Sequence, residues 1–109
     1  MTSASLNLVV LYVSDLDESR KFYELLGLDL TREQHGPEGP VHYAAELSGG
    51  TVLELYPAPT GVTSRVRLGL QIPDPAAAVE RLRTAHFTVK RSDLAVDPDG
   101  NRVVITGRS

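Results

Sequence analysis

The sequence contains no cysteine among its 109 residues. A disulfide framework, a thiolate nucleophile and a thiolate-ligated metal site are therefore excluded. There is also no basic tract, and the net charge is only −3, so the charge pattern does not indicate binding to nucleic acid. No apolar run approaches the roughly 20 residues that a helix needs to cross a bilayer, so we expect no membrane partner.

Several other signals are missing. The first residues lack a basic segment followed by an apolar one, so we expect no secretory signal and a cytoplasmic location. The loop at 36–40 lacks the glycine spacing, the lysine and the following helix of a phosphate loop, and no serine stands in a G-x-S-x-G context. The overall composition, 41% hydrophobic and 23% charged, is ordinary for a globular protein and fits one domain over residues 1–109.

Hydrophobic periodicity predicts the same order of elements twice. The first module, residues 5–57, is expected to contain a helix that begins after Asp15 and ends at Gly27, with strands at 6–13, 28–35, 41–47 and 51–56. The second module, residues 65–107, is expected to contain a helix that begins after Asp74-Pro75, with strands at 66–72, 87–90, 93–96 and 102–106.

The two modules align with each other at both ends. Residues 11–15 match 70–74 at an offset of 59, and residues 53–55 match 103–105 at an offset of 50. The second module is therefore shorter than the first. A βαβββ unit covers only one face of its sheet with its helix. The repeat thus predicts an α+β fold of two βαβββ modules in tandem, with sheets curled around a shared cleft.

One charged residue interrupts an apolar strand. Glu54 lies between Leu53 and Leu55, so its carboxylate projects from the face opposite the two leucines. A carboxylate in the middle of a strand needs a partner, a metal or a water-filled space. We therefore expect the chain to build its cleft around Glu54.

Several motifs together resemble the vicinal oxygen chelate superfamily, which includes glyoxalase I, bleomycin-resistance proteins, fosfomycin-resistance enzymes and extradiol dioxygenases. They are V-S-D-L at 13–16, F-Y-E-L-L-G-L at 22–28, E-L-Y-P at 54–57 and D-P-D-G-N-R-V at 97–103. Their order and spacing cover nearly the whole chain and are typical of the fold. They do not indicate an activity.

In the metalloenzymes of this superfamily, the first and last strands of each module supply the metal ligands. The resemblance transfers those positions to Leu8, Glu54, Arg67 and Val104, and the internal repeat likewise relates Leu8 to Arg67 and Glu54 to Val104. Only Glu54 can coordinate a metal, because an arginine stays protonated and the aliphatic side chains offer no donor atom. We expect no metal or other cofactor, and an ion pair in which Arg67 replaces the cation beside Glu54.

Strand parity extends the candidate site. The expected ligand-binding residues are Leu8, Tyr12, His42, Glu54, Tyr56, Arg67, Gln71 and Val104. None is assigned a catalytic role. The alternative is that Glu54 and Arg67 pair only to fill a shrunken cleft that binds nothing.

The face of His42 depends on the hairpin register. A two-residue loop at Gly49-Gly50 places Ala45 opposite Glu54, and His42 then points away from the cleft. A three-residue loop places Ala44 opposite Glu54, and His42 then joins the cleft. If His35 also converged on His42 and Glu54, the three would form an unconventional metal or acid–base site.

The resemblance and the candidate residues favour a metal-free binding protein of the glyoxalase/bleomycin-resistance type, which sequesters a compact aromatic or amphipathic ligand. One alternative is a metal-dependent lyase, isomerase or dioxygenase relative with ligands from His35, His42 and Glu54. Another is a non-catalytic accessory domain. Exposed strand edges and the resemblance further imply a homodimer.

Overall fold

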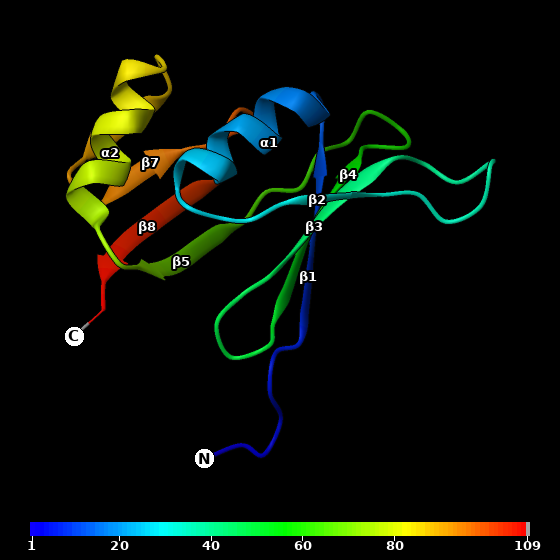
Figure 1. Ribbon diagram of the computed structural model, residues 1–109, viewed down its shortest axis with the longest axis horizontal. Helices are drawn as coiled ribbons and strands as arrows, with labels where there is room; N and C mark the ends of the chain where they lie inside the picture. Colours follow the sequence, from blue (N-terminus) through cyan, green and yellow to red (C-terminus); the bar gives the residue numbers. More distant parts are fainter. Residues whose placement is uncertain (109) are drawn as a thin grey trace.

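The computed structural model describes residues 1–108, which form two modules of one helix and four strands each (Figure 1). The first module contains β1 (Leu8–Val13), α1 (Leu16–Leu25), β2 (Thr31–Glu33), β3 (His42–Glu46) and β4 (Val52–Pro57). The second contains β5 (Arg67–Ile72), α2 (Pro75–Thr84), β6 (Thr88–Arg91), β7 (Leu94–Val96) and β8 (Arg102–Gly107).

Each module has its own mixed sheet. The strand orders are β1-β4-β3-β2 and β5-β8-β7-β6, and the first and last strands of each module pair in parallel. The predicted α+β fold of two βαβββ modules is confirmed. One strand is much shorter than expected, because the Leu28 amide still bonds to the Tyr23 carbonyl at the end of α1, and pairing begins only at Thr31.

The predicted helix boundaries follow from the caps. The Asp15 carboxylate accepts the Glu18 amide at 3.1 Å, and Asp74 accepts the Ala77 amide at 3.2 Å, so each satisfies an otherwise free N–H of the first turn. Gly27 ends α1 with a φ of 101°, a conformation that glycine adopts without steric cost. Neither helix within residues 1–108 has the length and apolar character to span a membrane.

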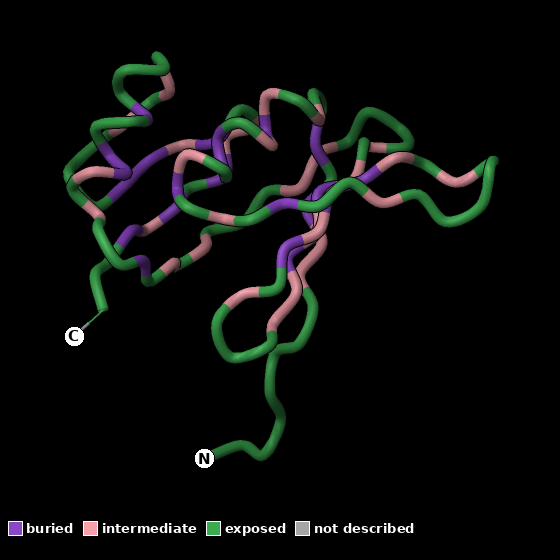
Figure 2. Tube along the Cα trace, viewed as in Figure 1, coloured by how far each residue is buried: buried purple, intermediate pink, exposed green. Residues whose placement is uncertain are grey.

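The core lies between the helices and the inner faces of the two sheets (Figure 2). Phe22 of α1 is fully buried and meets two rings edge-on. The ring centroids of Phe22 and Tyr23 are 4.9 Å apart, and those of Phe22 and Phe87 are 5.4 Å apart. Since Phe87 belongs to the second module, Phe22 joins the two halves of the core.

A buried carboxylate also joins the modules. Asp97, in the turn before β8, is only 4% exposed and accepts four hydrogen bonds. The Tyr23 hydroxyl of α1 donates one at 2.7 Å, the Asn101 amide and side chain donate two at 2.9 Å, and the Asp99 amide donates one at 3.0 Å. The Asn101 side chain in turn accepts the Val66 amide at 2.7 Å, which fixes the start of β5.

The buried hydrogen bond from Tyr23 to Asp97 predicts that the protein loses stability at alkaline pH. Burial, followed by the negative charge of Asp97, raises the pKa of Tyr23 well above its ordinary value of 10.0. Above about pH 10 the unfolded chain therefore releases a proton that the folded chain keeps, and the free energy of unfolding falls as the pH rises. Urea unfolding between pH 9 and 11 should show this fall, and Tyr23→Phe should make it shallower. Equal slopes for both proteins would contradict the assignment.

Candidate functional site

The first sheet presents one face to α1 and leaves the other uncovered. On β1 and β4, Leu11, Leu53 and Leu55 are buried in the core. The alternate residues Tyr12, Glu54 and Tyr56 lie on the opposite face and are exposed or half-buried. We call this opposite face the cleft face, after the cleft that the sequence predicts around Glu54; the cleft itself stays a prediction.

The hairpin register places His42 on the cleft face. Ala44 lies opposite Glu54 in the β3–β4 pairing. The Leu47 amide bonds to the Thr51 carbonyl, so three residues form the connecting loop. Of the two registers left open by the sequence, the three-residue loop is the correct one, and His42 shares a face with Glu54 and Tyr56.

Four rings form a row across this face. The Tyr12 and Tyr56 centroids are 6.3 Å apart, and His42 stacks on Tyr56 at 4.1 Å with an interplanar angle of 9°. His35 follows, with its centroid 5.1 Å from that of His42. We call Tyr12, Tyr56, His42 and His35 the aromatic row. Tyr12 and His35 are exposed, while His42 is buried between its neighbours.

Carboxylates surround the buried histidine. His42 Nε2 lies 3.1 Å from Glu33 Oε1 and 3.8 Å from Glu54 Oε2, while His42 Nδ1 lies 3.2 Å from the Pro40 carbonyl oxygen. Glu33 was not among the expected site residues. It reaches the cluster because β2 pairs with β3 so that Glu33 lies opposite His42. Only the strand register, which the sequence left open, could have identified it.

The same carboxylates act on Tyr56. Burial, followed by the charges of Glu54 and Glu33, raises the pKa of Tyr56 above its ordinary value. The phenol therefore stays neutral at physiological pH and keeps a hydroxyl that can donate to a bound group. This end of the cleft face is electronegative.

Within one chain, the described residues do not form the expected ion pair between Glu54 and Arg67. Glu54 Oε2 lies 3.8 Å from His42 Nε2 instead, and Arg67 is exposed on β5 in the other sheet. The internal repeat makes the strands of Leu8 and Arg67 equivalent within their modules. Equivalence of position does not bring the two sheets close enough for the side chains to meet.

The expected residues of the second module lie on the corresponding face of their own sheet. Arg67 and Gln71 alternate with the inward Leu68 and Leu70 on β5, and Val104 lies opposite Gly69 in the β5–β8 pairing. Arg67, Gln71 and Val104 are therefore not brought to the aromatic row within one chain. Leu8 lies on the cleft face of β1, four residues before Tyr12, and is 49% exposed.

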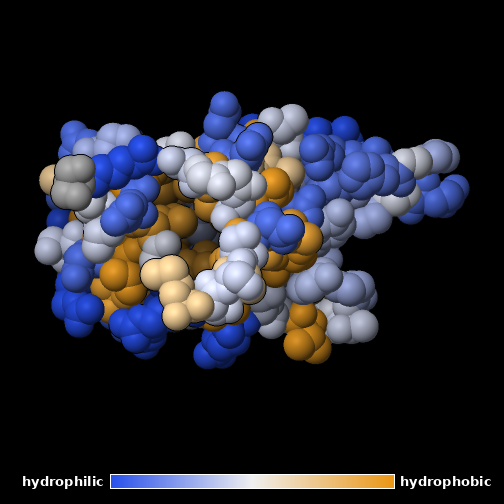
Figure 3. Space-filling view, turned by 90° about the horizontal axis from the view of Figure 1, so that it is seen from below, coloured by the Kyte–Doolittle hydropathy of each residue, from blue (hydrophilic) through white to orange (hydrophobic). Residues whose placement is uncertain are grey.

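A separate cavity lies between the modules. It has a volume of about 710 Å³ and is lined from the first module by Leu28, Asp29 and Leu47 among others, and from the second by Leu70, Gln71, Ile72 and Arg108 among others. Seen from below, the molecule is hollowed there, with hydrophobic side chains around the opening (Figure 3). Gln71 is the single expected ligand-binding residue in its wall.

Comparison with known proteins agrees with this fold. The family model described as Glyoxalase/Bleomycin resistance protein/Dioxygenase superfamily matches residues 5–105. No curated protein matches the sequence. The solved structures that resemble this chain include TnmS3, an antibiotic binding protein from Streptomyces sp. CB03234, with 27% identity, a TM-score of 0.69 and coverage of 100% of this chain and 99% of that one.

Two further structures share the fold at lower identity. The oxidase ChaP-H2 is 18% identical with a TM-score of 0.71, over 99% of this chain and 96% of its own. A variant of glyoxalase I from Zea mays is 19% identical with a TM-score of 0.75, over 95% of this chain and 44% of its own. Because a binding protein and enzymes share this fold, the fold alone does not decide between binding and catalysis.

Proposed function

The chain belongs to the Glyoxalase/Bleomycin resistance protein/Dioxygenase superfamily, and we propose that it binds a compact aromatic or amphipathic small molecule. The observation that carries the proposal is the aromatic row on the cleft face of the first sheet, whose outer member Tyr12 is 42% exposed. His42 and Tyr56 are stacked, and Tyr12 is tilted by 52° to Tyr56. Rings that are already held in place offer aromatic surface at little cost in conformational entropy.

Polar groups beside the row suit an amphipathic ligand. The Tyr56 hydroxyl can donate a hydrogen bond, and Glu54, whose side chain is 18% exposed, can accept one from a cationic or amide group. The antibiotic-binding protein TnmS3, which aligns over the full length of this chain, supports binding of a small molecule.

The four strand positions that hold metal in the superfamily's metalloenzymes do not fit a metal here. Leu8 and Val104 offer no donor atom, and the Arg67 guanidinium carries a positive charge. One carboxylate cannot replace the three or four ligands that a divalent transition metal needs. We therefore propose that the ligand is held without a metal at these positions.

Truncation of the central ring tests the proposed binding face. Tyr56→Ala removes the ring that links Tyr12 to His42 and should weaken binding of the cationic aromatic probe 9-aminoacridine at least tenfold, as measured by fluorescence titration. Val52 lies on the same face of β4 as Tyr56, on the other side of Glu54, so Val52→Ala serves as the matched control. Equal affinities for Tyr56→Ala and Val52→Ala would refute the proposed site.

We also propose that the protein is a homodimer. β1 and β5 each have a strand neighbour on one side only, and Leu8 and Val66 at or beside these strands are exposed. In a twofold pair, the exposed face of the second sheet, with Arg67, Gln71 and Val104, could close over the aromatic row of the other copy. All eight expected ligand-binding residues would then contribute to one site.

Disruption of the apolar edge tests the dimer. Light scattering of the wild-type protein at micromolar concentration should give about twice the chain mass of 11.8 kDa. Leu8→Glu places a carboxylate where the other copy would pack, and this variant should have the mass of one chain. A wild-type protein that is already monomeric would contradict the proposal.

A further inference from the structure

We propose that Glu33, His35 and His42 form a binding site for a divalent cation of the zinc or nickel class, at a place different from the four strand positions that the superfamily's metalloenzymes use. One ligand atom from each of the three residues lies within 4.8 Å of the other two. Imidazole nitrogens with a carboxylate oxygen are a donor set that zinc and nickel accept readily. This inference goes beyond the proposed binding of a small molecule.

One tautomer of His42 leaves Nε2 free to bind a metal. In this tautomer Nδ1 carries the proton and donates to the Pro40 carbonyl oxygen, which lies 3.2 Å away and can only accept. In a neutral ring, Nε2 then presents its lone pair to the cleft. Metal-binding histidines are commonly oriented by such a bond from the second ring nitrogen to a backbone carbonyl.

The Nε2 atom of His42 faces two carboxylate oxygens, which can only accept hydrogen bonds. Glu33 Oε1 lies 3.1 Å from His42 Nε2 and Glu54 Oε2 lies 3.8 Å from it, and ionised carboxylates have no proton to donate. The His42 side chain is only 1% exposed, so water does little to screen these groups from one another. Such a convergence is favourable when a positive charge lies among the three atoms. A divalent cation bound among them supplies that charge.

His35 adds a second imidazole to this convergence. It lies two residues beyond the end of β2, and its exposed ring lies 5.1 Å from the ring of His42, centroid to centroid. A metal bound there gains a further nitrogen ligand. Three protein ligands would leave one coordination position for water or for a molecule bound on the aromatic row.

The experiment is calorimetric titration of the chelator-treated protein with zinc chloride, and separately with nickel chloride. We expect one equivalent of metal to bind, and Glu33→Gln, His35→Ala and His42→Ala each to weaken binding at least tenfold. Glu33→Gln keeps the shape of a half-exposed side chain, so it remains informative if His42→Ala fails to fold.

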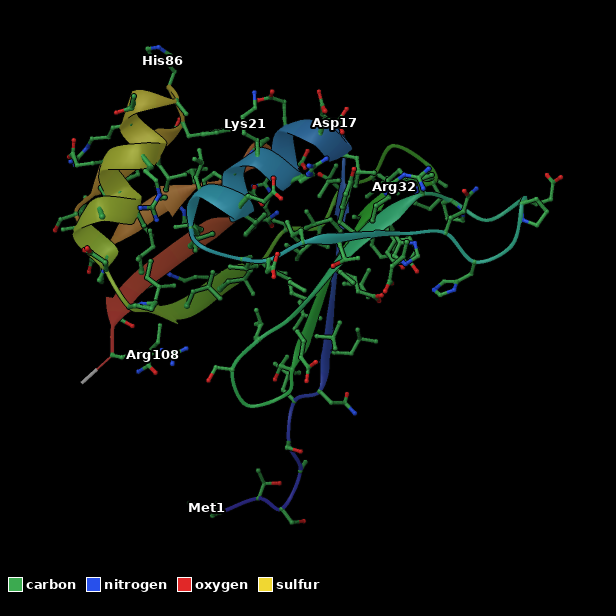
Figure 4. The ribbon with its side chains drawn as sticks, in the orientation of Figure 1. Met1, Asp17, Lys21, Arg32, His86 and Arg108 are labelled. Carbon is green, nitrogen blue, oxygen red and sulfur yellow. The ribbon has the colours of Figure 1, made fainter. Side chains whose placement is uncertain are left out.

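The third histidine supplies the control. His86 lies beyond α2, on the other side of the molecule from Arg32 of β2, the neighbour of Glu33 (Figure 4). Its φ of 68° favours His86→Asn over an alanine variant. His86→Asn should bind metal like the wild type. No heat from either metal, or equal binding by Glu33→Gln and the wild type, would overturn the site. A doubly protonated His42 ring in NMR spectra that does not change on adding zinc would also overturn it.

Discussion

Replacing Asp97 by alanine is expected to lower the free energy of unfolding by about 3–5 kcal/mol, because several buried donors lose their acceptor at once. The Tyr23 hydroxyl and the Asn101 side chain and amide would remain buried without a partner. Asn101 would also lose the orientation in which it accepts the Val66 amide. Urea unfolding monitored by circular dichroism measures the loss.

A matched aspartate separates this effect from the general loss of a negative charge. Asp93, in the turn just before β7, is exposed, and among the described residues its side chain pairs with the exposed Arg91 alone. Asp93→Ala should change the free energy of unfolding by no more than about 0.5 kcal/mol. A loss below about 1 kcal/mol for Asp97→Ala would show that the buried network does not join the modules energetically.

Replacing Phe22 by alanine should cost about 3–5 kcal/mol, since a fully buried ring is lost and a cavity remains between the modules. The cavity would open where Phe22 meets Phe87 and Tyr23 edge-on, so both halves of the core lose contacts. Because these contacts connect the modules, the wild-type protein should unfold in one transition.

Phe22→Leu is the companion variant. Leucine keeps much of the volume but loses the edge-to-face contacts, so we expect a smaller loss, about 1–2 kcal/mol. Two separate unfolding transitions in the wild-type protein, or a loss from Phe22→Ala no larger than that from Phe22→Leu, would contradict a core shared by the modules.

Local signals in the sequence were sufficient for most of the fold. The caps at Asp15 and Asp74, the stop at Gly27 and the repeat of strand and helix patterns all act within a few residues, so they could be read without the structure. The strand predicted at 28–35 was too long. Two of its first three residues are leucines, but the structure uses Leu30 to fill the core before pairing begins.

The site depended on distances that a linear pattern does not contain. Strand parity correctly placed Tyr12, Glu54 and Tyr56 on one face. The hairpin register decided the position of His42, and the register of a second strand pair brought in Glu33. The Glu54–Arg67 pair failed because it required contact between two sheets, and no local rule fixes that separation within one chain.

Proton–nitrogen correlation NMR of the labelled protein, recorded during titration with the cationic aromatic probe 9-aminoacridine, tests the proposed binding face most directly. We predict that the largest shifts occur at the amides of Tyr12, His42 and Tyr56, and that Tyr56→Ala removes them. Shifts confined to the wall of the inter-module cavity, at Leu28, Leu47 and Leu70, or no shifts at all, would contradict the account.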